Sequence, residues 1–168
     1  MSQSFGGEST VDPSTMRGRC WPCLRQFGIF LENRVGRLHD LLRHIERHDL
    51  KVMALSIVES VDYAVVRLMV NNYDRAKDVF SLSGFTVFES DIVGVELPDD
   101  PQPFARICLA LLQAEVNIHY TYPLLYRRQG RGAIALCVDD VDQGMRILAD
   151  KGHRIITETD LMDYDEYL

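Results

Sequence analysis

No uninterrupted apolar run in this 168-residue chain approaches the roughly 20 residues that a membrane-spanning helix requires. The N-terminus is polar and carries Glu8 and Asp12, where a signal peptide would carry an apolar segment. Both absences argue against membrane insertion and secretion, so we expect a cytoplasmic protein with no membrane partner. Met16 is a candidate for the true start.

Basic residues and cysteines are also scarce. Lys and Arg total 18 against 25 Asp and Glu, which gives a formal net charge of -7, and such a field repels the phosphate backbone of nucleic acid. The four cysteines, in a chain without an export signal, predict reduced thiols rather than a disulfide framework. The sequence offers no nucleophile elbow, no phosphate-binding glycine loop and no carboxylate pair with acid/base spacing, so we expect neither catalysis nor a cofactor.

What the sequence does contain is an internal repeat. An apolar stripe of helical period runs from Leu38 to Ile45, and its offsets recur from Phe104 to Leu111. Alternating apolar residues predict a strand over 64–70, and the same alternation returns over 132–138. The chain is therefore expected to fold as two copies of one unit.

Each copy reads as strand, helix, strand, strand, helix, strand. In the first copy these elements are expected at 24–31, 36–49, 51–59, 62–71, 73–83 and 85–89, and the second copy begins at Asp91. The order βαββαβ predicts an α+β protein of two ferredoxin-like modules in tandem, whose antiparallel sheets pair side by side with helices on one face. The expected organisation is a flexible N-terminal arm (1–23), module 1 (24–90), module 2 (91–157) and an acidic C-terminal tail (158–168).

Three features leave alternatives open. The tail is expected to be solvated, the alternative being that it docks through Leu161, Tyr164 and Tyr167. Cys20 and Cys23 precede the first strand, which favours a structural arm over a redox or metal role. His44 and His48 are one helical turn apart, a spacing that can hold zinc, but the sequence places no third ligand beside them, so no metal site is predicted.

The strongest candidate for a binding site is the segment from Glu32 to Leu38, where the chain passes from a strand into a helix. Gly36 would allow a ligand to approach main-chain N–H groups at the positive end of the helix, a place suited to a carboxylate. The alternative is that Asn33 and Gly36 do no more than form the turn.

Three features together resemble the ACT domain family of amino-acid-sensing regulatory modules, in its stand-alone tandem form that is similar to acetolactate synthase regulatory subunits. They are the segment Phe30–Leu38 (FLENRVGRL), the two βαββαβ copies, and Val116-Asn117-Ile118 at the start of a strand in the second copy. The resemblance implies a non-catalytic regulatory protein, expected to form a homodimer, that binds a free amino acid and acts on a separate enzyme. It implies a site between two modules packed into one eight-stranded sheet, formed by Asn33, Arg34, Val35, Gly36, Arg37, Leu38, Asn117 and Ile118.

The reciprocal site departs from the family pattern. Its loop, 99–103, reads Asp-Asp-Pro-Gln-Pro, with two carboxylates that would repel a third and two prolines that donate no N–H. We therefore expect one competent site per chain, with a lining that depends on Met53, Leu55, Tyr120 and Tyr122. The alternative function is a structural or assembly module with a degenerate ligand site, acting through protein–protein contacts.

Overall fold

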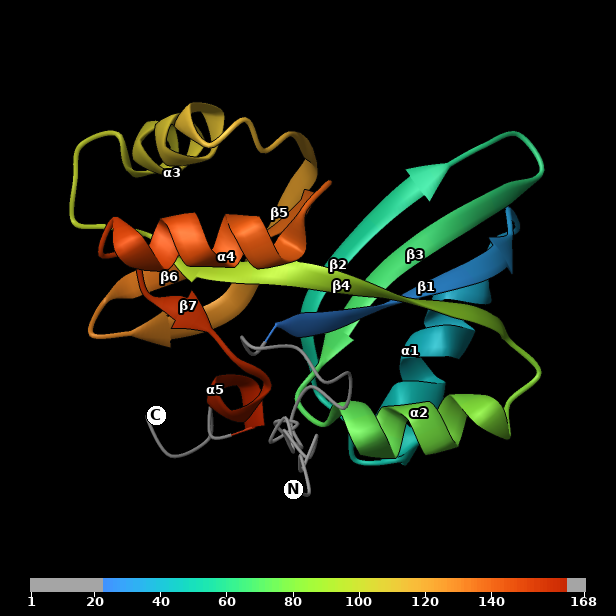
Figure 1. The fold of residues 1–168 in the computed structure, drawn as a ribbon. Coiled ribbons are helices and arrows are strands. Elements are labelled where there is room, and N and C mark those ends of the chain that lie inside the picture. The colour runs from blue at the N-terminus through green and yellow to red at the C-terminus, as the bar shows by residue number, and fades with distance from the viewer. Residues whose placement is uncertain (1–22, 163–168) are drawn as a thin grey trace, which may run out of the picture.

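The computed structural model describes residues 23–162, in which seven strands form one antiparallel sheet (Figure 1). The first copy comprises β1 (Leu24–Glu32), α1 (Arg37–Arg47), β2 (Val52–Glu59), β3 (Tyr63–Val70), α2 (Tyr73–Ser81) and the first part of β4 (Thr86–Glu96). The second comprises the rest of β4, then α3 (Pro103–Gln113), β5 (Ile118–Arg128), β6 (Arg131–Val138), α4 (Val141–Asp150) and β7 (Ile155–Ile156), and is followed by α5 (Glu158–Met162). The tandem ferredoxin-like fold predicted from the sequence is confirmed.

Helix caps recur at equivalent places in the two copies. Asn72 accepts a hydrogen bond from the Arg75 main-chain N–H at the start of α2, and Asp140 accepts one from Gln143 at the start of α4. Such side chains satisfy donors that a first helical turn leaves unpaired. The first helices of the two copies differ, because α1 follows Gly36 and α3 begins with a proline.

Strand β4 belongs to both modules. Its residues Thr86–Ile92 pair with β1, whereas Val93–Glu96 pair with β6, and Gly94 and Val95 also pair with β7. The sequence interpretation ended one strand at residue 89 and began the second copy at about Asp91, but both positions lie inside this continuous strand. The described sheet therefore has seven strands in the order β2-β3-β1-β4-β6-β5, with β7 beside β4, rather than the eight implied by the resemblance.

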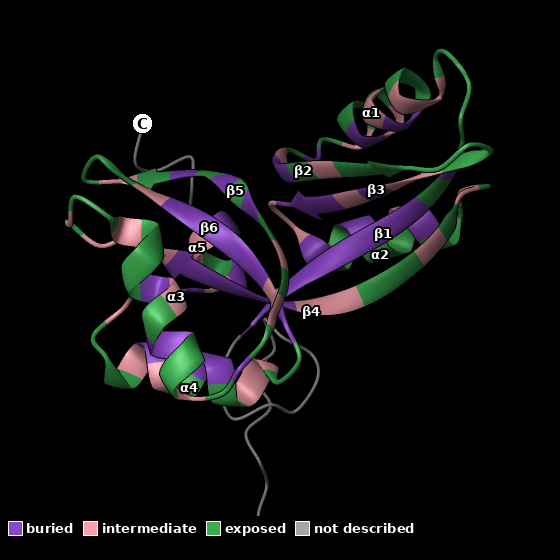
Figure 2. Ribbon diagram, turned by 90° about the horizontal axis from the view of Figure 1, so that it is seen from above, coloured by how far each residue is buried: buried purple, intermediate pink, exposed green. Residues whose placement is uncertain are grey.

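Within residues 23–162 the buried apolar side chains form three cores. In one, α1 and α2 cover Phe27, Ile29 and neighbouring residues of module 1, and in another, α3 and α4 cover Val93, Leu136 and neighbouring residues of module 2. The third core lies between the helix-free faces of the two modules; its members include Leu24, Met53, Met69, Tyr122, Leu124, Tyr126 and Ala135. The sheet thus folds over on itself, so that β2 lies against β5 and helices α1 to α4 remain outside (Figure 2).

A buried polar cluster links the modules inside the third core. Gln26, which is fully buried, accepts a hydrogen bond from the Tyr122 hydroxyl and donates one from Nε2 to the Tyr120 oxygen at 3.0 Å. The Arg67 guanidinium lies over the Tyr120 ring, 3.6 Å from its centroid. Burial raises the pKa of Tyr122 above its usual value.

The chain end beyond β7 packs on this interface. Leu161 is 1% exposed and belongs to the third core, and Glu158 is buried and accepts a hydrogen bond from the Arg25 N–H at 2.7 Å. The expectation that the tail is solvated is therefore wrong for Glu158 and Leu161, which are buried, whereas Thr159 and Met162 are exposed. Tyr164 and Tyr167 lie outside the described residues, as do Met16 and Cys20; Cys23 is buried in the core of module 2. None of the described helices has the length and apolar character needed to cross a membrane.

Candidate functional site

The loop between β1 and α1 is held against the β2–β3 hairpin by Asn33. Its main-chain N–H donates to the Asp62 carbonyl at 3.2 Å, and its side-chain amide donates to Glu59 Oε1 at 2.7 Å and to the Ser60 carbonyl at 3.1 Å. Gly36 has a φ of 92°, in the left-handed region that favours glycine, and directly precedes α1. The loop geometry thus depends on the end of β2 and on the turn between β2 and β3, as well as on the sequence of the loop itself.

A cavity of about 200 Å³ lies beside this loop, and we call it the loop cavity. Its polar lining is Glu32, Asn33, Arg34, Arg37 and Glu59, and its apolar lining is Leu31, Leu38, Ile57, Ala64 and Val66. Four of the predicted residues, Asn33, Arg34, Arg37 and Leu38, therefore lie on one cavity. Val35 is fully exposed, and neither it nor Gly36 lines the cavity.

Charge in the loop cavity is partly unpaired. Arg34 forms an ion pair with Glu32, and Arg37 Nη1 lies 3.8 Å from Asp40. Arg37 Nε is buried and has no hydrogen-bond partner among residues 23–162. A buried donor without an acceptor is costly, and this one sits at the positive end of α1. The arrangement can accept an anionic group.

Asn117 and Ile118 lie elsewhere. Together with Ala105, Cys108, Leu109, Leu112 and Val116 they line a cavity of about 510 Å³ between α3 and the start of β5. The Asn117 N–H donates to Asp139 Oδ1 at 3.0 Å. This cavity shares no lining residue with the loop cavity, so the structure does not bring the two predicted halves of the site together within one chain.

The four residues expected to line the pocket line neither cavity. Met53 and Tyr122 are buried in the third core, and Tyr120 packs against it. Leu55 is paired with Leu68, so it lies on the helix-bearing face of the sheet. For Met53, Tyr120 and Tyr122 the physical reason is that the modules pack through their helix-free faces, so these side chains are buried in the interface between β2 and β5.

In the loop before α3, which corresponds to the β1–α1 loop of module 1, the side-chain carboxylate of Asp100 already binds the nearby donors. Asp100 accepts hydrogen bonds from the Gln102 N–H at 2.8 Å and from Arg106 Nε at 2.9 Å. These hydrogen bonds lower the pKa of Asp100 below its usual value, and the bond from the Gln102 N–H contributes more than the one from Arg106. The donors that would meet a ligand carboxylate at this position are thus already in use.

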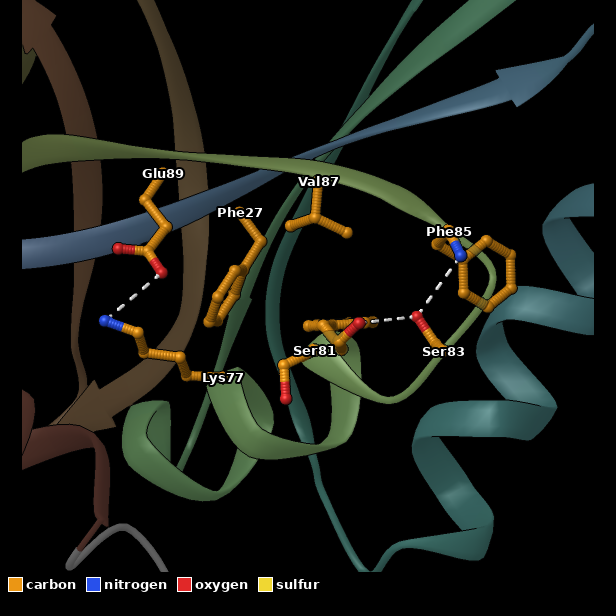
Figure 3. A pocket seen from close by; sticks show the side chains of 8 residues that line it. Phe27, Lys77, Ser81, Ser83, Phe85, Val87 and Glu89 are labelled. Carbon is orange, nitrogen blue, oxygen red and sulfur yellow. Dashed lines mark hydrogen bonds and ion pairs between the residues drawn. The ribbon is translucent and has the colours of Figure 1, made fainter.

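A further cavity, which the sequence interpretation missed, separates α2 from β4 (Figure 3). It measures about 330 Å³, and its apolar walls are Phe27, Phe80, Phe85 and Val87. At one end Lys77 Nζ lies 3.8 Å from Glu89 Oε1, and the Tyr73 hydroxyl donates to Glu89 Oε2 at 2.5 Å. The charged groups of this cavity, Lys77 and Glu89, therefore pair with each other, whereas Arg37 Nε in the loop cavity has no acceptor among the described residues.

The His44 and His48 rings lie 4.7 Å apart, and His48 Nδ1 is 2.8 Å from the His44 carbonyl. Among the described residues, no cluster of three His, Cys, Asp or Glu side chains is arranged to hold a metal ion. Burial, followed by the charges of His48 and Arg47, lowers the pKa of His44.

The fold and the loop cavity define a tandem ferredoxin-like protein with a small polar site where its first strand passes into its first helix. The chain belongs to the family described as the ACT domain pair, whose model matches residues 23–164, so it is placed among regulatory modules. A search of curated proteins finds no match.

Two solved structures are similar over most of their length. Protein BT0572 from Bacteroides thetaiotaomicron is 26% identical, with a TM-score of 0.76, over 83% of this chain and 96% of that one. The ligand-free regulatory subunit of aspartate kinase from Thermus thermophilus shares the fold at 13% identity and a TM-score of 0.55, over 77% of this chain and 93% of that one.

Proposed function

We propose that the protein is a non-catalytic regulator that binds a free amino acid in the loop cavity. The observation that carries this proposal is the buried Arg37 Nε, a donor with no acceptor in the described chain, on a cavity at the N-terminal end of α1. A ligand carboxylate would satisfy Arg37 and would gain from the positive end of the helix.

The remaining lining suits the other parts of an amino acid. The Glu59 carboxylate offers an acceptor for an α-ammonium group, and it already accepts from Asn33, which would keep it in place. Leu31, Ile57 and Val66 provide an apolar wall without an aromatic ring or a charge. An aliphatic side chain is the best complement to that wall.

The volume also limits the ligand. At about 200 Å³ the loop cavity is smaller than the roughly 300–1,000 Å³ of typical drug or cofactor sites. It suits a small amino acid better than a nucleotide. In this proposal the ligand acts on a separate enzyme chain in the cytoplasm, and it can do so only if it binds two states of the protein with unequal affinity.

The test is a thermal-shift screen of the full chain against the proteinogenic amino acids, followed by calorimetric titration. A ligand at about 100 times its dissociation constant adds roughly 2.7 kcal/mol to the stability of the folded state. For a domain of this size that corresponds to a rise in Tm of about 5–11 °C. We expect an aliphatic amino acid to give the shift, and no response to any amino acid would contradict the proposal.

Three variants separate the contributions. Arg37→Gln removes the guanidinium and is expected to abolish the shift, whereas Arg43→Gln, on the exposed part of the same helix, should preserve it. Asn117→Ala tests the joint site implied by the resemblance. Because Asn117 lines a different cavity, ligand affinity should survive its substitution, and loss of binding would show that a second chain completes the site.

The assembly module remains the second candidate, and a specific observation favours it. The amide nitrogen of Asn33 donates to Glu59 and to Ser60, as expected for a residue that only fixes a turn. In that case Asn33→Ala would lower Tm, and no amino acid would change the Tm of the parent protein.

A further inference from the structure

The helix-free face of module 1 is only half covered. Near Leu24 and Met69 it is buried against module 2, but farther along the strands it carries exposed apolar side chains. Phe30, Tyr63 and Phe88 are 44%, 48% and 41% exposed. Module 2, by contrast, buries Tyr122, Leu124, Tyr126, Ala133 and Ala135 of its own helix-free face.

Strand register places these residues on one continuous surface. Phe30 lies opposite Val65 on β3 and Thr86 on β4, and Val65 lies opposite Val58 on β2. Directly opposed residues project to the same face of a sheet. We call the surface formed by Phe30, Val58, Tyr63, Val65 and Phe88 the aromatic face.

The aromatic rings are organised across the strands. The Phe30 ring centroid is 5.4 Å from that of Phe88 and 6.0 Å from that of Tyr63. The Phe88 ring covers Gly28, where a Cβ would lie 2.0 Å from ring atom Cζ, so glycine is required for this ring position. The aromatic face is therefore a continuous apolar patch whose rings contact one another, rather than a set of scattered exposed residues.

Charge is confined to the border of the aromatic face. Arg67, two residues from Val65 on β3, directs its guanidinium onto the Tyr120 ring of module 2, and Glu32 at the other end pairs with Arg34. An uncharged apolar surface can meet an identical surface without like-charge repulsion. Enrichment in aromatic residues with charge at the rim is typical of interface centres.

The molecule already contains the kind of packing that would cover this face. In the third core, the helix-free face of one module is buried by the helix-free face of the other. The aromatic face is the uninterrupted continuation of that buried surface along β1, β3 and β4. We propose that the aromatic face is covered by the aromatic face of a second copy of this chain, in an isologous two-fold dimer.

The test is sedimentation equilibrium of the full chain without ligand, from low to high micromolar concentration, with two substitutions on β2. Val58 and Leu55 are 44% and 36% exposed but project to opposite faces of the sheet, and Leu55 does not line the loop cavity. Val58→Lys places a charge in the proposed interface, and Leu55→Lys places the same charge on the helix-bearing face. Since β2 is an edge strand, it should tolerate either lysine.

We expect the parent chain to dimerise and Val58→Lys to raise the dimer dissociation constant by about a hundredfold, because an unpaired buried charge is strongly disfavoured. Leu55→Lys should leave that constant unchanged. Phe30→Asp is the second interface variant, with circular dichroism to confirm folding. A monomeric parent chain would overturn the proposal, as would a dimer that neither Val58→Lys nor Phe30→Asp weakens. Neither outcome bears on amino-acid binding, which calorimetry measures separately.

Discussion

Replacing Gln26 by methionine should weaken the contact between the two modules. Methionine keeps the length of the side chain but removes both groups that bond Tyr120 and Tyr122. Each lost hydrogen bond is worth about 1 kcal/mol, and a buried hydroxyl left unpaired costs about 1–3 kcal/mol. Tyr122 is the more deeply buried of the two, so we expect Gln26→Met to lower the free energy of unfolding by about 3 kcal/mol.

Urea denaturation and calorimetry measure this loss. For a chain of this length, about 3 kcal/mol corresponds to a fall in Tm of about 6–12 °C. It is also a large share of the roughly 5–15 kcal/mol that holds a typical domain folded.

A double-mutant cycle isolates the hydrogen bond itself. Tyr122→Phe removes one hydroxyl and leaves the bond between Gln26 and Tyr120 in place. The double variant should be less destabilised than the sum of the single variants by about 1–2 kcal/mol, since both remove the same interaction. Additivity to within about 0.5 kcal/mol would refute the conclusion that this bond joins the modules.

Three further substitutions test other parts of the structure. Gly94→Val should lower the free energy of unfolding, measured by urea denaturation, by about 1–3 kcal/mol, because its Cβ would lie 2.5 Å from Leu24 Cδ1 and 3.1 Å from Ile156 Cβ. An unchanged free energy would show that Leu24 and Ile156 are loosely packed around Gly94. Leu161→Ala should cost about 2–4 kcal/mol in the same assay, whereas a freely solvated tail would give no change. Burial raises the pKa of Tyr122, so its contribution is complete below the unfolded pKa of about 10 and is lost as pH rises above it. Tyr122→Phe should therefore flatten the fall of stability measured between neutral and strongly alkaline pH.

The repeat, the element order and most element boundaries could be predicted because they depend on local patterns. The predicted strand at 51–59 and helix at 73–83 each lie within two residues of the observed β2 and α2. The fusion of two strands into β4 could not be predicted in this way. Ser90 and Asp91 are polar and resemble a turn, but they pair with Gln26 and Arg25 of β1, and the strand continues into residues 93–96, which pair with β6.

The candidate site was predicted only in part. The loop residues Asn33, Arg34, Arg37 and Leu38 follow one another in the sequence and carry a recognisable pattern, and all of them line one cavity. Glu59 and Ile57 complete the lining from β2, and their contribution depends on the distance between strand and loop, which no local pattern encodes. The assignment of Asn117 assumed that the modules lie side by side with the loop after the first strand next to Asn117. In the structure the modules pack through their helix-free faces instead.

The shared strand β4 limits how this protein can evolve. A gene that encoded one half alone would have to end or begin inside β4, because Thr86–Ile92 and Val93–Glu96 serve different modules on one continuous segment of backbone. An insertion of one residue within β4 would move the side chains on one side of it to the wrong face. Recombination should therefore exchange the pair as a unit, and length variation should collect in the connecting loops.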